Sequence, residues 1–301
     1  MGNSISEIDI NNPEIFFFKK KYNWIPSFPM KEYDNITNSN VGKYINTTFE
    51  LSKTYIDLRV NCPPILNIGE LPLHPIATVV SMINYQLNVN KLPLFPPSRL
   101  FIYKNCGFYP EVKSVISYEM IFKSIDKFGF CSEVDFPYIE ENLYSKPSIK
   151  DYKIAESFKF IDVFKVDNDI KLLKRFLQNE KPLMIGMVLY NGLEKIIDKI
   201  WLPDLSIDKR VGGITGLIVG YSDDRECFII KMAFGKSFGN SGYIMVPYNY
   251  INDVTLVPEI YYLDLKKNRI EGFINQKREV ISLSNEKKIY NDNNSYKSIF
   301  N

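Results

Sequence analysis

The chain has 301 residues but only one histidine, His74, and this scarcity limits its chemistry. A structural zinc site normally takes four nitrogen or sulfur ligands. One histidine and four cysteines without a CxxC pair do not supply such a set. Four scattered cysteines do not predict a disulfide framework either. We therefore expect no metal, no cofactor and a reducing compartment.

Long apolar runs and clustered positive charge are also missing. No segment approaches the roughly 20 apolar residues that span a bilayer, and no basic-then-apolar signal peptide opens the chain. A formal net charge of +2 with only short lysine runs does not form the basic stripe of a nucleic-acid-binding face. A chain that is 45% hydrophobic and 24% charged can form one globular domain with a sizeable core. We expect an unsecreted protein without a nucleic-acid partner.

The most informative segment is residues 57–77, which read DLRVNCPPILNIGELPLHPIA. It resembles the papain-like (C1) cysteine peptidases, in the bacterial and viral branch that reads DLR-x-x-CPP-V-x-x-QG-x-L-G-S-C. Without a gap, the family's oxyanion-hole glutamine falls on Ile68, a glycine falls on Pro72, and the nucleophilic cysteine falls on His74. The segment keeps the scaffold of the motif and loses its chemistry.

Further motifs extend this resemblance, in the family's order, over about residues 20–265. They are YNWIPSFP at 22–29, PSRLFIY at 97–103, FGFCSEVDFPY at 128–138, GGITGLIVGY at 212–221 and IKMAFGKSFG at 230–239. In the last two, Ile214 stands where the family has its catalytic histidine, and Met232 where it has the orienting asparagine. The resemblance implies an α+β, papain-like two-lobed fold with a helical left lobe and a β-barrel right lobe.

The replaced positions argue against the family's reaction. A thiol peptidase needs a thiolate, an imidazole base, a group that orients the base, and amide donors for the oxyanion. Loss of triad members costs a serine peptidase about 10⁴ to 10⁶ in turnover. Here all four positions are changed, to Ile68, His74, Ile214 and Met232. We expect no peptidase activity and interpret the three apolar replacements as core residues.

His74 itself has several interpretations. The simplest is a packed or capping residue at the start of a helix, where a neutral imidazole is favoured because the helix N-terminus disfavours a cation. Cys62, twelve residues earlier, could contact it and form a new thiol–imidazole pair, without the family's orienting group or glutamine donor. A third interpretation is an enzyme with altered chemistry built around His74.

The first residues, MGNSIS, fit the N-myristoylation pattern M-G-x-x-x-[ST], with Gly2 as the acceptor. One myristoyl chain binds membranes only marginally and needs a second signal. That signal could be a run of aromatic and basic residues, because aromatic rings favour the interface and lysines favour anionic head groups. The run is Phe16, Phe17, Phe18, Lys19, Lys20 and Lys21. Alternatively, these rings pack on the domain and the lysines are solvated.

The pattern along the chain divides it into three parts. We expect an N-terminal extension at residues 1–45 lying across the domain, a papain-like domain at 46–265, and a polar C-terminal tail at 266–301. Apolar spacing predicts helices that start at Pro75 and that span residues 115–128 and 170–177. Short apolar runs predict strands at 182–190, 217–221, 227–231 and 242–246.

These inferences favour a catalytically inactive homologue that serves as a structural, scaffold or protein-interaction component. Its partners would be scaffold or capsid-like neighbours, with membrane contact through Gly2. An excess of Ile, Asn, Lys and Tyr hints at an AT-rich coding sequence, as in a large DNA virus, so we expect a cytoplasmic or virion location. The alternative is a module that binds peptides in the interlobe cleft without cutting them. Bulky Pro72 and Leu73 disfavour an open cleft.

Overall fold

The computed structural model describes residues 22–27, 33–47, 53–69, 71–92, 95–107, 115–193 and 200–265. Gly2, the aromatic and lysine run at 16–21 and the tail at 266–301 lie outside the described residues, so the predictions made for them stay predictions. None of the described helices is both long enough and apolar enough to cross a membrane.

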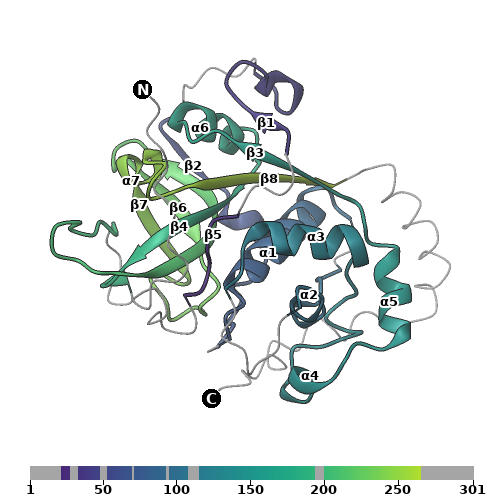
Figure 1. Ribbon diagram of the computed structural model, residues 1–301. Helices are drawn as coiled ribbons and strands as arrows, with labels where there is room; N and C mark the ends of the chain where they lie inside the picture. Colours follow the sequence, from purple (N-terminus) through teal and green to yellow (C-terminus); the bar gives the residue numbers. More distant parts are fainter. Residues whose placement is uncertain are drawn as a thin grey trace, which may run out of the picture.

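The chain forms two lobes, one mainly helical and one built on a sheet (Figure 1). The helical lobe contains α1 (His74–Val89), α2 (Arg99–Asn105), α3 (Tyr118–Phe128), α4 (Glu140–Tyr144) and α5 (Ile149–Glu156). Two short 3₁₀ helices, η2 (Val41–Lys43) and η3 (Arg59–Asn61), lie in the connections before α1. The longest helix, α1, packs against the sheet and is buried on almost all sides, as expected for a helix between two lobes.

Local sequence explains where the helices begin and end. Pro75 in the first turn of α1 fits the predicted start, because proline needs no backbone N–H there. The helix predicted at 115–128 starts later, at Tyr118, because the Ser117 side chain accepts a hydrogen bond from the Met120 N–H and caps it. Gly129 ends this helix at φ 72°, where other residues are strained. The helix predicted at 170–177 is α6 (Ile170–Gln178).

The sheet lobe contains β1 (Asn35–Ile36), β2 (Tyr55–Asp57), β3 (Ile161–Val166), β4 (Leu183–Tyr190), β5 (Arg210–Ser222), β6 (Cys227–Lys231), β7 (Tyr243–Pro247) and β8 (Glu259–Leu265). Their order is β1-β3-β8-β4-β5-β6-β7, with β2 paired to β5. A short helix, α7 (Tyr248–Asn252), follows β7. Within the described residues, no pairing joins β1 to β7, so the sheet does not close into a complete barrel.

The α+β two-lobed prediction is confirmed, and the four predicted strands correspond to β4, β5, β6 and β7. The pattern missed β1, β2, β3, β8 and the first half of β5. Glycines at 212, 213 and 216 interrupt the apolar run of β5, and β3 is half-exposed without clear alternation. Ile36, Val41 and Ile45 belong to the main core, so packing continues into the predicted extension.

Candidate functional site

The site is centred on His74, the first residue of α1, which is fully buried. Its Nδ1 accepts a hydrogen bond from the backbone N–H of Thr215 on β5, at an N–N distance of 3.2 Å. The same nitrogen lies 2.9 Å from Oγ1 of Thr215. The imidazole therefore joins the central helix to the sheet.

This hydrogen-bond pattern fixes the protonation state of the ring. Because Nδ1 is an acceptor, the proton of the neutral imidazole sits on Nε2. Nε2 is buried and has no hydrogen-bond partner within the described part of the chain. Burial lowers the pKa of His74 to about 3, since a cation there would lose its hydration. The ring is neutral at physiological pH, as predicted for a helix N-terminus.

Thr78 completes the hydrogen-bonded group. Its hydroxyl donates to the backbone carbonyl of His74 at 2.9 Å, one turn earlier in α1. It also lies 3.0 Å from Oγ1 of Thr215, so the single hydroxyl proton of Thr215 can go to Thr78 or to the imidazole. Both threonines are buried. Hydrogen bonds among His74, Thr78 and Thr215 thus occupy Nδ1 and both hydroxyls without any charged group, whereas Nε2 has no partner within the described residues.

Ile68, at the position of the oxyanion glutamine, is a buried packing residue. Its backbone N–H donates to the carbonyl of Ala233 at 3.2 Å, and its own carbonyl accepts from the Tyr138 hydroxyl at 2.8 Å. The Tyr138 ring in turn lies under the guanidinium of Arg99, 4.1 Å from its centroid. The backbone of this segment keeps a defined geometry, but an isoleucine side chain has no donor for an oxyanion.

Ile214 and Met232 occupy the positions of the base and its orienting group, and both are buried. Ile214 lies on β5, paired with Met187 of β4. Gly216 also lies on β5, and the Met232 sulfur packs against it. A Cβ added at Gly216 would lie 3.1 Å from this sulfur. Phe234, two residues after Met232, places its ring 5.9 Å from that of His74. The structure therefore brings the segments of all four predicted positions together and surrounds them with apolar side chains.

An N-terminal segment lies between the two lobes beside this site. We call residues 22–27 the strap. Tyr22 accepts a hydrogen bond from the N–H of Gly213, directly before Ile214, at 3.3 Å. The Ile116 N–H donates to the carbonyl of Asn23 at 3.0 Å, and the Ile25 N–H returns a bond to Ile116 at 3.1 Å. The strap thus binds the helical lobe on one side and the sheet on the other by main-chain hydrogen bonds.

The Trp24 side chain anchors the strap and is 2% exposed. Glycines make room for it, because a Cβ at Gly186 would lie 2.0 Å from the indole ring and a Cβ at Gly213 would lie 2.1 Å from the Trp24 carbonyl. The Tyr118 ring stands 6.4 Å away, edge-on. Tyr22 extends the cover over the site, with its ring 5.8 Å from that of Phe234.

Cys62 does not take part in this arrangement. Its thiol donates to the carbonyl of Leu58 at 3.5 Å, while the contacts of the imidazole are with Thr215 and Phe234. Burial raises the pKa of the Cys62 thiol to about 11, so it stays protonated at neutral pH. The thiol–imidazole pair considered from the sequence is therefore not formed. Among the described residues, no cluster of three His, Cys, Asp or Glu side chains is placed to hold a metal ion.

The sequence predicts the Trp24 motif as an anchor of the N-terminal extension, but it does not single out Thr78 or Thr215. Thr78 had a usable signal, because it follows His74 by four positions on the same helix face. The signal for Thr215 is weaker: it directly follows Ile214, the position at which the family has its catalytic histidine.

No family model matches the chain, but individual proteins resemble it in sequence and in fold. An uncharacterized peptidase C1-like protein of Acanthamoeba polyphaga mimivirus is 30% identical over 183 residues. That match covers 56% of this chain and 59% of the viral protein, so it spans less than two thirds of the relative.

Solved structures match over more of the chain. Xylellain, a cysteine protease from Xylella fastidiosa, is 26% identical with a TM-score of 0.72, covering 82% of this chain and 97% of xylellain. A digestive procathepsin L2 from Tenebrio molitor is 16% identical with a TM-score of 0.66, covering 85% and 81%. Procathepsin B from Trypanosoma congolense is 14% identical with a TM-score of 0.64, covering 82% and 87%. The last two likenesses concern the fold alone.

Proposed function

This chain is a homologue of the papain-like (C1) cysteine peptidases of the bacterial and viral branch, and we propose that it acts by binding other proteins rather than by cutting them. The observation that carries the proposal is the state of His74. At the position of the nucleophile stands a fully buried, neutral imidazole whose acceptor nitrogen is occupied by Thr215. Ile68, Ile214 and Met232 supply no donor, base or orienting group around it.

The alternative of an enzyme with altered chemistry at His74 is disfavoured because a substrate has no access to the residues involved. A hydroxyl 2.9 Å from an imidazole nitrogen could in principle form a nucleophile–base pair, as Thr215 and His74 do in distance. Both side chains, however, have 0% exposure, so a substrate would have to displace the packing around them. A base whose pKa is about 3 is also weakly suited to accept a proton at neutral pH.

The first role we propose is a structural or scaffold component that presents this fold to protein neighbours. The viral origin of the 30% identical relative is compatible with a component of a large DNA virus particle. Membrane contact through a myristoylated Gly2 belongs to the same proposal. Quantitative mass spectrometry of purified particles tests it, because a structural component is present there at a fixed ratio to the other particle proteins.

The strap sets a condition for the peptide-binding alternative. The interlobe region does hold an extended peptide through main-chain hydrogen bonds to Ile116 and Gly213, but that peptide is the chain's own residues 22–25. An external peptide would have to displace Trp24 from the space that Gly186 and Gly213 leave for it. This alternative therefore requires release of the strap, whereas the scaffold role does not.

A peptidase assay tests whether the natural chain is catalytically inactive. We expect the natural chain to leave a diverse peptide library uncut and to show no labelling by electrophilic probes of thiol peptidases. A single variant that combines Ile68→Gln, His74→Cys, Ile214→His and Met232→Asn tests whether the scaffold can still support the family's reaction. Cleavage by the natural chain, absent from a His74→Asn control, would overturn the proposal.

A further inference from the structure

Three large aliphatic side chains are exposed together on the loop that leads into β5. Leu202 is 60% exposed, Leu205 53% and Ile207 75%. Figure 1 shows this loop, described over residues 200–209, projecting from the sheet lobe on the side away from the helical lobe. Exposed apolar residues grouped in this way mark a contact surface more often than residues scattered singly do. We call residues 202–208 the apolar tip.

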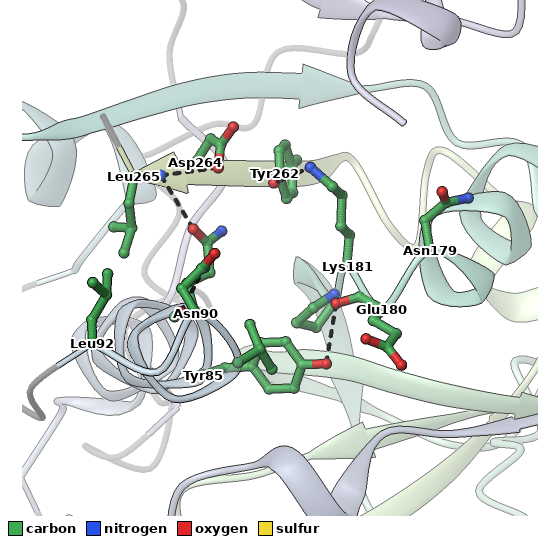
Figure 2. Close-up of a pocket in the computed structure, with 12 residues that line it drawn as sticks. Tyr85, Asn90, Leu92, Asn179, Glu180, Lys181, Tyr262, Asp264 and Leu265 are labelled. Atoms are coloured by element: carbon green, nitrogen blue, oxygen red, sulfur yellow. Dashed lines mark hydrogen bonds between the residues drawn. The ribbon is translucent and has the colours of Figure 1, made fainter. Parts of the chain in front are cut away.

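The cavity of about 500 Å³ at the C-terminal end of α1 is different, because its polar lining groups bond to one another (Figure 2). Lys181 donates from Nζ to the Tyr262 hydroxyl at 2.8 Å, and the Tyr85 hydroxyl donates to the Glu180 carbonyl at 3.1 Å. The three aliphatic side chains of the apolar tip, in contrast, face water.

The base of the loop is fixed to the sheet lobe. The buried Trp201 donates from its backbone N–H to the carbonyl of Met245 on β7 at 2.7 Å, and its ring lies 5.0 Å from that of Tyr250. On the other side of the loop, the Asn191 N–H donates to the Lys209 carbonyl at 3.0 Å. The Lys209 N–H returns a bond to the Asn191 side-chain oxygen at 2.9 Å. The apolar tip is therefore presented from a fixed base.

The turn within the apolar tip satisfies much of its own backbone. The N–H groups of Ile207 and Asp208 donate to the Asp204 carbonyl, at 3.1 and 2.7 Å. The Asp204 side chain accepts from the Ser206 N–H at 3.0 Å, and the Asp208 side chain accepts from the Asp204 N–H at 2.8 Å. A backbone whose polar groups are already bonded enters an apolar medium at lower cost. Both carboxylates thus hold the turn while the aliphatic side chains stay exposed.

The strap begins beside the base of this loop. A Cβ at Gly212 would lie 2.3 Å from the Tyr22 carbonyl oxygen, so Tyr22 lies against the start of β5. The bridge between Asn23 and Gly213 is parallel, and the N-terminal end of the strap therefore points toward Arg210 and the loop. The 21 residues that precede the strap, Gly2 among them, join the described structure at this place.

From this arrangement we propose that the apolar tip inserts into the surface of a lipid bilayer. The inference rests on the proposed membrane contact through Gly2, and the tip supplies the second signal that a single myristoyl chain needs. A projecting tip suits a bilayer because lipid chains close around it, whereas a protein partner would need a matching groove. Within residues 202–210 two acidic residues are balanced by two basic ones. The contribution of the tip should therefore depend little on lipid charge or on salt.

Co-sedimentation of the natively expressed full chain with vesicles tests the proposal. The vesicles are phosphatidylcholine alone and an equal mixture of phosphatidylcholine and phosphatidylserine. The double variant Leu205→Ser with Ile207→Ser should lower the vesicle partition coefficient about tenfold on both compositions, because two aliphatic side chains are lost from the apolar contact. Val134→Ser, at a position 61% exposed on the helical lobe, is the matched control and should leave partitioning unchanged.

The same double variant in a Gly2→Ala background separates the tip from the lipid. We expect the tip substitutions to lower partitioning by a similar factor there. If they change nothing in either background while Gly2→Ala abolishes binding, the tip proposal is wrong and the membrane contact through Gly2 stands. If only the tip substitutions weaken binding, the lipid is removed from the proposed function and the tip stands. Failure of the natural chain to bind either kind of vesicle overturns both.

A fluorescence measurement locates the tip directly. Trp24 and Trp201 are each 2% exposed, so a Leu205→Trp variant adds an exposed indole to two buried ones. With vesicles, its emission should shift to shorter wavelength and be quenched by brominated phosphatidylcholine, whereas a Val134→Trp variant should show neither change. An unshifted Leu205→Trp emission in vesicle-bound protein contradicts insertion. A concentration-dependent dimer that the double serine variant abolishes, without vesicle binding, would assign the tip to a second copy of the chain instead.

Discussion

His74 on the central helix accepts a hydrogen bond from the backbone N–H of Thr215 on β5, across 141 positions of the chain. The position at which the family has its nucleophile is therefore used here to join the two lobes. This relationship gives the imidazole a structural role that can be measured.

The first prediction concerns the pH dependence of stability. The pKa of His74 falls from 6.5 to about 3 on folding. At pH values between these two, the folded state therefore binds fewer protons than the unfolded state. The stability associated with the neutral ring is fully present above about pH 6.5 and is lost as the pH falls toward 3, by about 4–5 kcal/mol in total. Urea unfolding across this range should show the loss in the natural chain. The His74→Asn variant, whose side-chain oxygen can still accept a hydrogen bond from the Thr215 N–H, should not show this loss of stability.

The ring can also be observed directly. Since the chain has one histidine, its imidazole proton resonances are unambiguous in an NMR spectrum. We expect no titration of these resonances between about pH 8 and pH 5, where an ordinary histidine changes charge. A midpoint near the ordinary value would mean that the ring is solvated and the buried arrangement is wrong.

The two threonines should act as a unit with His74. Thr215→Val and Thr78→Val keep the side-chain shape but remove a buried hydroxyl, and each should cost about 1–2 kcal/mol in the free energy of unfolding. Because the two hydroxyls are 3.0 Å apart, the double variant should cost less than the sum. Additive losses in the double-mutant cycle would show that the hydroxyls do not interact.

The order of family motifs was sufficient to predict the two-lobed fold. Ile68, His74, Ile214 and Met232 lie in segments that the structure brings together. What could not be predicted was the partner of His74. A hydrogen bond between residues 74 and 215 leaves no local pattern, because neither periodicity nor composition reports on contacts so far apart.

An extension lying across the domain is predicted from the sequence, but the residues with which the strap pairs, and several strands, are not, for related reasons. The strap pairs with Gly213 and Ile116 through isolated bridges, which need no alternation of apolar and polar residues. β1 is two residues long, and β3 exposes both faces in part. Such segments are fixed by the sheet to which they add and not by their own sequence.

A buried carboxylate near the strap predicts a pH effect of opposite sign. Glu259 accepts from the Ser27 N–H at 2.6 Å and from the Tyr261 hydroxyl at 3.3 Å, and its Oε2 is buried without a partner among the described residues. Burial raises its pKa, against smaller lowering effects that include Lys165. The folded state therefore binds more protons, and stability should fall as the pH rises from the ordinary glutamate pKa of 4.5 through the raised value.

Glu259→Gln separates this contribution from that of His74. In a His74→Asn background, unfolding measurements should show the decline with rising pH, and adding Glu259→Gln should remove it. Glu141→Gln, on the exposed surface of α4, serves as a control. An unchanged pH profile after Glu259→Gln would show that the carboxylate is solvated in solution.

The N-terminal prediction requires a separate measurement. Intact mass of the natively expressed protein should show Met1 removed and a myristoyl group on Gly2. Gly2→Ala should abolish the addition and reduce co-sedimentation with anionic vesicles, since the chain loses its lipid. An acetylated or unmodified Gly2 would remove the lipid from the proposed function without affecting the interpretation of His74.

The last prediction tests the strap through a pair of substitutions. Trp24→Ala should cost about 3–5 kcal/mol if the strap is docked as observed, because a large buried ring is lost. Gly186→Ala should also destabilise the natural chain, since its Cβ would lie 2.0 Å from the Trp24 indole. In the Trp24→Ala background the same methyl group has room, so Gly186→Ala should become nearly neutral. Gly42→Ala, whose Cβ would meet nothing closer than 3.7 Å, should be tolerated in both backgrounds. An equal cost of Gly186→Ala with and without the ring would mean that Trp24 does not fill this place, and the interlobe region would then be free to bind an external peptide.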